Sequence, residues 1–98
     1  MSHLAHEVRH EETTGHGRYF IRLAPGAEAE MTYRRSSDRT MVIGHTEVPR
    51  AFEGRGIAAQ LVDAAIADAR KEGYKIVPLC SYVSAQFLRH PEWRDLLA

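Results

Sequence analysis

Two glycines in the middle of the chain, Gly54 and Gly56, belong to the stretch with the clearest chemistry. Glycine has no Cβ, so backbone N–H groups beside it can approach a ligand closely. The residues from Ile57 onward have the apolar spacing of a helix, and a helix start presents unpaired N–H groups and the positive end of a dipole. The stretch His45–Ala59 therefore predicts a strand end, a glycine loop and a helix start that bind a phosphorylated ligand through the backbone.

Two other phosphate-binding loops have similar glycine spacing, and the surrounding sequence argues against both. Gly54, Gly56 and Ala59 match the dinucleotide-binding pattern G-x-G-x-x-G/A, which requires an acidic residue roughly 20 positions further on. The segment from Ile76 to Pro78 contains no acid, and too little chain follows to build a doubly wound sheet. A P-loop closes with Gly-Lys-Ser/Thr, whereas no lysine follows Gly56 here.

Two side chains near the loop have chemistry of their own. Cys80 precedes a second predicted helix, whose N-terminus favours a thiolate; the alternative is a small buried apolar residue. His45 lies shortly before the loop, and we place it on the strand face that carries Met41, Ile43 and Glu47. There it is either a hydrogen-bonded core residue or a general base near neutral pH.

The helix after the loop is predicted over Arg55–Glu72. Its apolar residues form one stripe at spacings of three to five, which is expected to face the core. The stripe consists of Ile57, Leu61, Val62, Ala65, Ile66 and Ala69. Gly73 stands where a left-handed residue commonly ends a helix. A second helix is predicted over Ser81–Arg89, and it ends before Pro91 because the residue preceding a proline avoids helical geometry.

Strands are predicted on both sides of the first helix. Ala27–Tyr33 alternates apolar and polar residues, which indicates one buried face, and Met41–Val48 is apolar on both faces, which favours a central position. The expected strands are 7–12, 18–23, 27–33, 41–48 and 75–79, with turns at 14–17, 25–26 and 36–39. Strand, helix, strand implies a parallel pair. We therefore predict an α+β fold in a single domain, 1–98, with a mixed, mostly antiparallel sheet of about five strands and two main helices.

Composition excludes several functional classes. The 98 residues include 13 basic and 13 acidic side chains, so we expect neither nucleic acid nor a membrane surface as a partner. No apolar run approaches the roughly 18 residues of a membrane span. The single cysteine suits a reducing cytoplasm. The N-terminal histidines 3, 6, 10 and 16 lack the pairing of a zinc site, and we expect no metal site in the chain. We expect a monomer or weak dimer.

The sequence resembles a subfamily of very small proteins in the GNAT superfamily of N-acetyltransferases. The matching blocks, in order, are His45–Pro49, Gly54–Ala58, Val77–Cys80 and Arg89–Trp93. The loop is similar to the acetyl-CoA loop Q/R-x-x-G-x-G/A, and it departs from that pattern at Glu53, where Gln or Arg is usual. The resemblance implies a reduced GNAT fold, with acetyl-CoA as cosubstrate and its pantetheine between the two parallel strands.

The resemblance also implies which residues bind the cofactor. Backbone groups at the end of the first parallel strand would pair with pantetheine, loop amides would bind the pyrophosphate, an arginine would reach the 3′-phosphate, and two rings would line the arm. These residues are Glu47, Val48, Arg50, Gly54, Arg55, Gly56, Ile57, Ala58, Ala59, Tyr82 and Phe87.

The activity implied is transfer of acetyl to an unidentified amine, on a small molecule or a protein. His45 would assist direct attack by the amine, or Cys80 would relay the acetyl group. The alternative is a non-catalytic module that binds CoA, acyl-CoA or another protein. It arises because this short chain lacks the N-terminal helices that frame an acceptor pocket in longer GNAT proteins.

Overall fold

A five-stranded sheet forms one layer of the computed structural model, which describes residues 6–37 and 39–98. The strands, in spatial order, are β1 (Arg9–Thr13), β2 (His16–Ala24), β3 (Ala27–Ser37), β4 (Thr40–Glu47) and β5 (Lys75–Pro78). Neighbouring strands from β1 to β4 are antiparallel, and β5 is parallel to β4. The expected mixed, mostly antiparallel sheet is confirmed. Of the expected turns, 36–39 includes a position outside the described residues.

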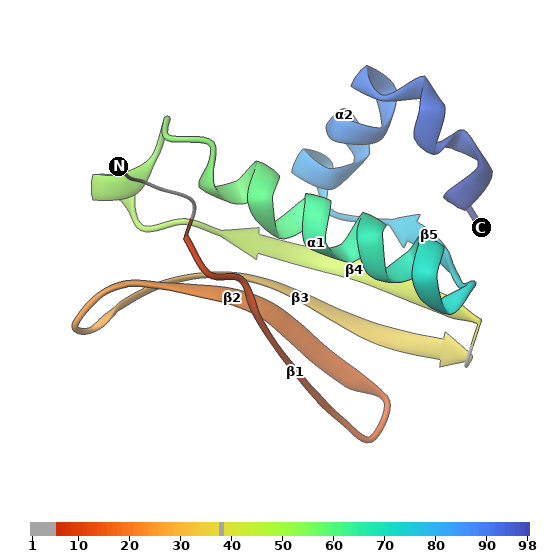
Figure 1. Ribbon diagram of the computed structural model, residues 1–98, viewed down its shortest axis with the longest axis horizontal. Coiled ribbons are helices and arrows are strands. Elements are labelled where there is room, and N and C mark those ends of the chain that lie inside the picture. The colour runs from red at the N-terminus through yellow and green to blue at the C-terminus, as the bar shows by residue number, and fades with distance from the viewer. Residues whose placement is uncertain (1–5, 38) are drawn as a thin grey trace.

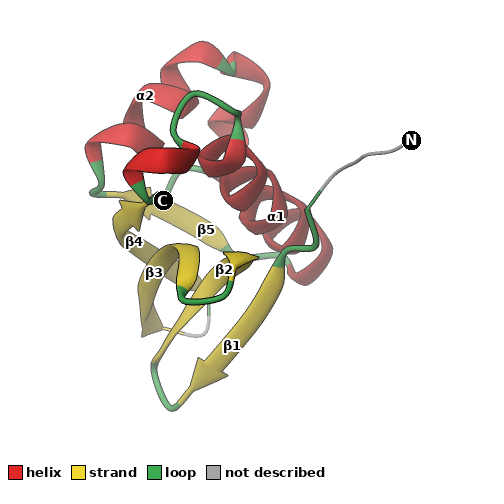
Figure 2. Ribbon diagram, turned by 90° about the vertical axis from the view of Figure 1, so that its left-hand side faces the viewer, coloured by secondary structure: helices red, strands yellow, loops and turns green. Residues whose placement is uncertain are grey.

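The helices form the second layer. They are α1 (Ile57–Glu72) and α2 (Ser81–Arg89), with short 3₁₀ helices η1 (Arg50–Phe52) and η2 (Pro91–Leu96). Both α-helices lie on one side of the sheet (Figures 1 and 2). The first begins two residues later than expected, because Gly56 has a φ of 75°, which a right-handed helix cannot contain. Among the described residues, no helix is both long and apolar enough to cross a membrane.

The core lies between these layers and fixes the position of α1. The whole predicted stripe of α1 is buried, from Ile57 to Ala69, against inward side chains of β2 and β3 such as Ile21 and Met31. Burying a Leu or Ile side chain contributes roughly 1.5–3 kcal/mol. The start of α1, and with it the glycine loop, is therefore anchored firmly to the sheet.

An extra residue in β4 changes the face that the end of this strand presents. Tyr33 lies opposite Ile43, whereas Thr32 lies opposite His45, so Gly44 is a β-bulge. A one-residue shift exchanges the two faces of a strand. His45 therefore shares the open face of the sheet with Glu47, and its expected place beside Met41 and Ile43 is wrong.

The parallel pair ends before β4 does. Its last paired residues are Ile43 and Pro78. The carbonyl oxygen of Ile43 accepts hydrogen bonds from the N–H groups of both Leu79 and Cys80, at 3.0 and 3.1 Å, as the chain turns into α2. Residues 44–47 of β4 continue past this point, so their edge toward β5 is left without a strand partner.

Candidate functional site

A cleft of about 350 Å³ opens where β4 outruns β5 and α1 begins. The end of β4, the glycine loop, the first turn of α1 and the start of α2 all contribute to its walls. The lining residues are Thr46, Val48, Phe52, Glu53, Gly54, Gly56, Ile57, Ala58 and Tyr82. Six of these belong to the set expected from the sequence to bind the cofactor. The structure therefore brings together the two features on which that expectation depended, the unpaired strand end and the glycine loop.

The glycine loop requires glycine at two positions. Gly54 and Gly56 have φ values of 81° and 75°, in the left-handed region that side chains with a Cβ rarely adopt. A Cβ built on either residue would meet no atom within 4 Å. Glycine is therefore required here for its backbone conformation and not to avoid a clash. Open space remains beside the backbone at both positions.

The start of α1 has the properties of an anion site. No side chain caps it, and its first turn contains no acidic residue. The first N–H groups of the helix are thus left without a protein acceptor side chain, at the positive end of the helix dipole. Among residues 6–37 and 39–98, neither Arg50 nor Arg55 forms an ion pair, and the Arg55 guanidinium lies 5.2 Å from the centre of the Phe52 ring. Positive charge is therefore available on the rim.

Cys80 lies beside the cleft, at the N-cap of α2. Its thiol donates a hydrogen bond to Thr46 Oγ1 at 3.4 Å. Burial raises the pKa of the Cys80 thiol, but hydrogen bonds involving Thr46 and the backbone of Val83 and Tyr82 outweigh burial and bring the pKa below its ordinary value. The half-buried sulfur is thus biased toward the thiolate, the nucleophilic form.

Several residues predicted for the site lie outside the lining of the cleft. Phe87 is buried, with its ring 5.4 Å from that of Trp93 in an edge-on contact, so it packs α2 against η2. His45 lies on the open face with Glu47, the face opposite Thr46 and Cys80. Arg50, Arg55 and Ala59 flank the cleft without lining it.

Three lining residues, Thr46, Phe52 and Glu53, were not in the expected set, although Glu53 was noted as the departure from the loop pattern. Thr46 follows the bulge, and the alternation of β4 turns it toward Cys80 once Gly44 is counted as an extra residue. Phe52 is an aromatic residue two positions before Gly54, in a segment read as loop. The signal that could have identified Phe52 as a lining residue was its aromatic ring in an otherwise polar loop.

A larger hollow of about 650 Å³ lies at the far end of the sheet, beside the C-terminal half of α1. Its polar side chains bind one another. Glu12 accepts hydrogen bonds from Tyr33 at 2.6 Å and Arg35 at 3.2 Å, and Asp68 accepts one from Tyr19 at 2.7 Å. We therefore regard this network as structural, and assign the candidate site to the smaller cleft.

Comparison with known proteins identifies the family of the chain. The family model described as GCN5-related N-acetyl-transferase matches residues 18–96, which include the whole cleft. The chain is 36% identical over 63 residues to Protein NATD1 from Xenopus tropicalis. That match covers 64% of this chain and 58% of the relative's length.

A solved structure supports the fold independently. The NMR solution structure of a GCN5-like N-acetyltransferase candidate from Staphylococcus aureus superposes with a TM-score of 0.69. The match covers 92% of this chain and 87% of that chain, at 23% sequence identity. At that identity the likeness concerns the fold.

Proposed function

The chain belongs to the GCN5-related N-acetyltransferase family, and from this premise we propose that it binds acetyl-CoA and transfers its acetyl group to an amine. The observation that carries the proposal is the start of α1, which no side chain caps and which follows two glycines with left-handed backbone. This helix start lines a cleft, and the end of β4, which has no strand partner toward β5, lines it too. Backbone N–H groups in such a place suit a pyrophosphate. The single cysteine favours a reducing, cytoplasmic setting for the reaction.

Each part of the cofactor would have its own set of protein groups. Amides from Gly54 to Ala59 would bind the pyrophosphate, with Arg50 or Arg55 on the 3′-phosphate. The free backbone edge at Glu47 and Val48 would pair with the pantetheine amides. Tyr82 takes the role of an aromatic wall, and the lining residue Phe52 replaces Phe87 as the second.

For the chemistry we favour a relay through Cys80. Its thiolate would attack the acetyl carbonyl of acetyl-CoA, and the CoA thiolate would leave and take up a proton. The amine would then attack the new thioester, which restores the Cys80 thiolate and releases the amide and a proton. His45 lies on the open face, opposite Cys80, so it would accept that proton only from an amine that reaches the acetyl group across the unpaired edge of β4 beyond Ile43.

A second candidate function, a CoA-binding module without catalysis, is favoured by one observation. Both α-helices cover the same face of the sheet, and among the described residues no element covers the face that carries His45. An acceptor would therefore lie on an open surface unless a partner protein supplied a wall.

A thiol-release assay distinguishes the two functions. Purified protein is mixed with acetyl-CoA and a panel of amines, including aliphatic amines, aromatic amines and lysine peptides, and free CoA is measured. An enzyme releases CoA faster with an acceptor than without one, and the Cys80→Ala variant loses this increase. Tight binding of CoA with no acceptor-dependent release would support the module instead.

A further inference from the structure

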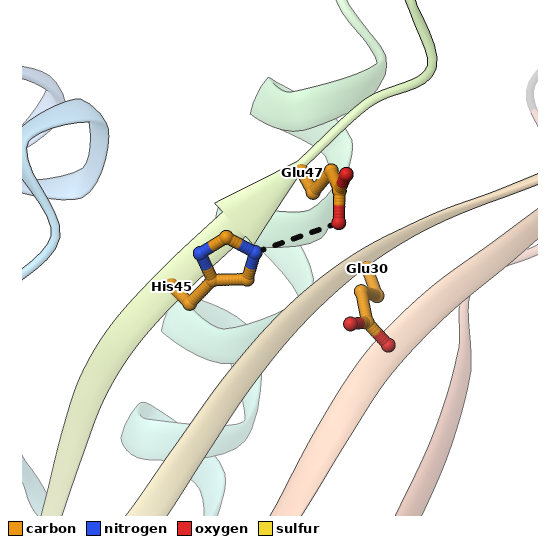
Figure 3. A group of neighbouring side chains, drawn as sticks. All are labelled: Glu30, His45 and Glu47. Atoms are coloured by element: carbon orange, nitrogen blue, oxygen red, sulfur yellow. Dashed lines mark ion pairs between the residues drawn. The ribbon is translucent and has the colours of Figure 1, made fainter.

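Three side chains able to bind a metal meet on the open face of the sheet, away from the cleft. They are Glu30 on β3 and His45 and Glu47 on β4, and one ligand atom of each lies within 4.8 Å of the others (Figure 3). We propose that this cluster binds a divalent transition-metal ion of the zinc class. The proposal goes beyond acetyl transfer and departs from our expectation that the chain has no metal site.

The backbone brings these three side chains together. The Gly44 bulge turns His45 onto the face that Glu47 occupies, and Glu30 lies directly opposite Glu47 in the register of β3 and β4. Residues on neighbouring strands of a sheet have fixed spacing. The three positions are therefore set by the strands and not by a loop.

Negative charge is in excess where Glu30 and Glu47 face each other on β3 and β4. Like charges directly opposite each other on antiparallel strands are destabilising, and Glu30 faces Glu47 in this way. Arg18 Nη1 binds one oxygen of Glu30 at 3.0 Å but also serves Glu28 at 2.9 Å. Among the described residues, Glu47 forms an ion pair only with His45, at 3.6 Å. A cation between the two carboxylates would remove the repulsion.

The donor set indicates which cation. One imidazole and two carboxylates suit zinc and related metals, whereas calcium and magnesium prefer oxygen ligands alone. Ligand atoms around tetrahedral zinc are about 3.4 Å apart, given bonds of about 2.1 Å. His45 Nε2 and Glu47 Oε1 are already 3.6 Å apart. Both side chains are more than half exposed, so small rotations can close the site around an ion.

The bound ion would have a second layer of contacts and an open position. Arg18 Nη1 donates a hydrogen bond to Glu30 Oε1 at 3.0 Å, and such a contact behind a ligand helps to orient it. Three protein ligands leave a fourth position for water or another molecule. Because the ion would take His45 Nε2, it would also remove this histidine as a proton acceptor. Metal binding itself does not depend on the proposed acetyl transfer.

Calorimetric titration with zinc chloride, on metal-free protein without a histidine tag and without acetyl-CoA, tests the proposal. We expect one zinc ion per chain, and a loss of affinity of about tenfold or more in each of His45→Gln, Glu47→Gln and Glu30→Gln. His90→Gln is the matched control, because His90 and Glu92 form another exposed His–Glu pair, at 2.9 Å, that has no second carboxylate beside it among residues 6–37 and 39–98. A second control replaces His3 and His6 with Gln.

Both controls should bind zinc as the parent does, and circular dichroism checks that every variant is folded. The proposal is overturned if the parent binds no zinc, if His45→Gln and Glu47→Gln bind it with parental affinity, or if the His3/His6 variant alone loses it. The Co²⁺ visible spectrum gives a second readout, since an imidazole ligand predicts a spectrum that His45→Gln abolishes and His90→Gln preserves.

Discussion

At the scale of single residues, Thr46 is the side chain that hydrogen-bonds to Cys80. Burial of the sulfur raises the pKa of Cys80, whereas the Thr46 hydroxyl, which can donate to the thiolate, lowers it. Removing the hydroxyl leaves burial in place, so the pKa of Cys80 rises in Thr46→Val. We expect alkylation by iodoacetamide, which follows the thiolate, to reach half its maximal rate at a higher pH in this variant. Thr40→Val, at the other end of β4, is the control, and an equal midpoint in Thr46→Val would contradict the role of Thr46.

Cys80 itself is tested by looking for the acetyl group on it. If Cys80 is the relay, intact mass spectrometry after addition of acetyl-CoA without an acceptor shows a single acetyl adduct. The adduct is absent in Cys80→Ala. It persists in His45→Ala, because His45 lies on the opposite face of the sheet. Acetyl transfer to an amine with no adduct detected in the parent would favour direct attack and make Cys80 a packing or pantetheine-contact residue.

At the scale of elements, the glycine loop before α1 offers a matched pair of variants. Gly56 and Gly26 have φ values of 75° and 78°, and at neither would a Cβ meet an atom within 4 Å. Alanine in the left-handed region costs roughly 1–2 kcal/mol, so both Gly→Ala variants should lose similar thermal stability. Only Gly56→Ala adds a Cβ in the cleft. We expect CoA affinity to fall about tenfold or more in Gly56→Ala and to stay at the parental value in Gly26→Ala.

Calorimetric titration with CoA, together with a melting curve for each variant, makes this comparison. Equal affinity in the two variants would mean that the pyrophosphate does not approach the loop at Gly56. A loss in both would indicate that general destabilisation, and not the cleft, weakens binding.

The edge strand β1 gives a prediction that depends on pH. The hydrogen bond from Tyr33 lowers the pKa of Glu12, burial opposes this, and Arg35 lowers it further, with a net shift downward. A folded-state pKa below the unfolded value stabilises the fold when Glu12 is ionised, and the gain is lost as pH falls through the folded pKa. Urea denaturation should therefore show Glu12→Gln less stable than the parent at pH 7, with a difference that shrinks once pH falls below the ordinary Glu pKa of about 4.3 and vanishes below the lowered folded-state pKa.

Glu7→Gln is the control for this series, because within the part of the chain that the structure describes Glu7 forms only an exposed pair with Arg9, at 3.7 Å. It should change stability little at any pH. A difference between Glu12→Gln and the parent that is constant across pH would assign the effect to packing instead of charge.

How far the sequence predicts these elements depends on what each pattern encodes. The stripe of α1 and the alternation of β3 report burial directly, and both were predicted correctly. The face of His45 was predicted wrongly, because the bulge depends on pairing with β3 and its trace in the sequence is a single glycine, Gly44, inside a strand pattern. The position of Phe87 outside the cleft lining could not be predicted for a related reason. Its apolar position indicates burial, but not whether the ring packs toward the cleft or toward Trp93.

The candidate cleft at the start of α1 could likewise be predicted only in part. The conformational needs of Gly54 and Gly56 are local, so the loop could be recognised from residue types alone. Thr46 and Phe52 reach the cleft only through tertiary geometry. The Glu30 partner of His45 comes from another strand, and no spacing within β4 points to it.

At the scale of the whole molecule, the end of β4 can be reached from two sides, because the helices cover one face of the sheet and leave the other open. The cleft opens on the side of the helices, while His45, Glu47 and Glu30 lie on the open face (Figure 3). In the proposed reaction the cofactor would enter from the first side and the amine from the second. A metal ion on the open face would then compete with the amine for His45 without displacing CoA.

The central claim, that the cleft at the start of α1 binds CoA, is tested most directly by two-dimensional ¹H–¹⁵N NMR of the 98-residue chain during titration with CoA. We predict that the largest shift changes fall on the backbone amides of Thr46, Val48, Gly54, Gly56 and Ile57, and that NADH at the same concentration moves them much less. Amides around the far hollow, such as those of Glu12 and Glu72, should stay in place. Shift changes centred on that hollow, or no shift changes at a large excess of CoA, would contradict binding of CoA at the start of α1.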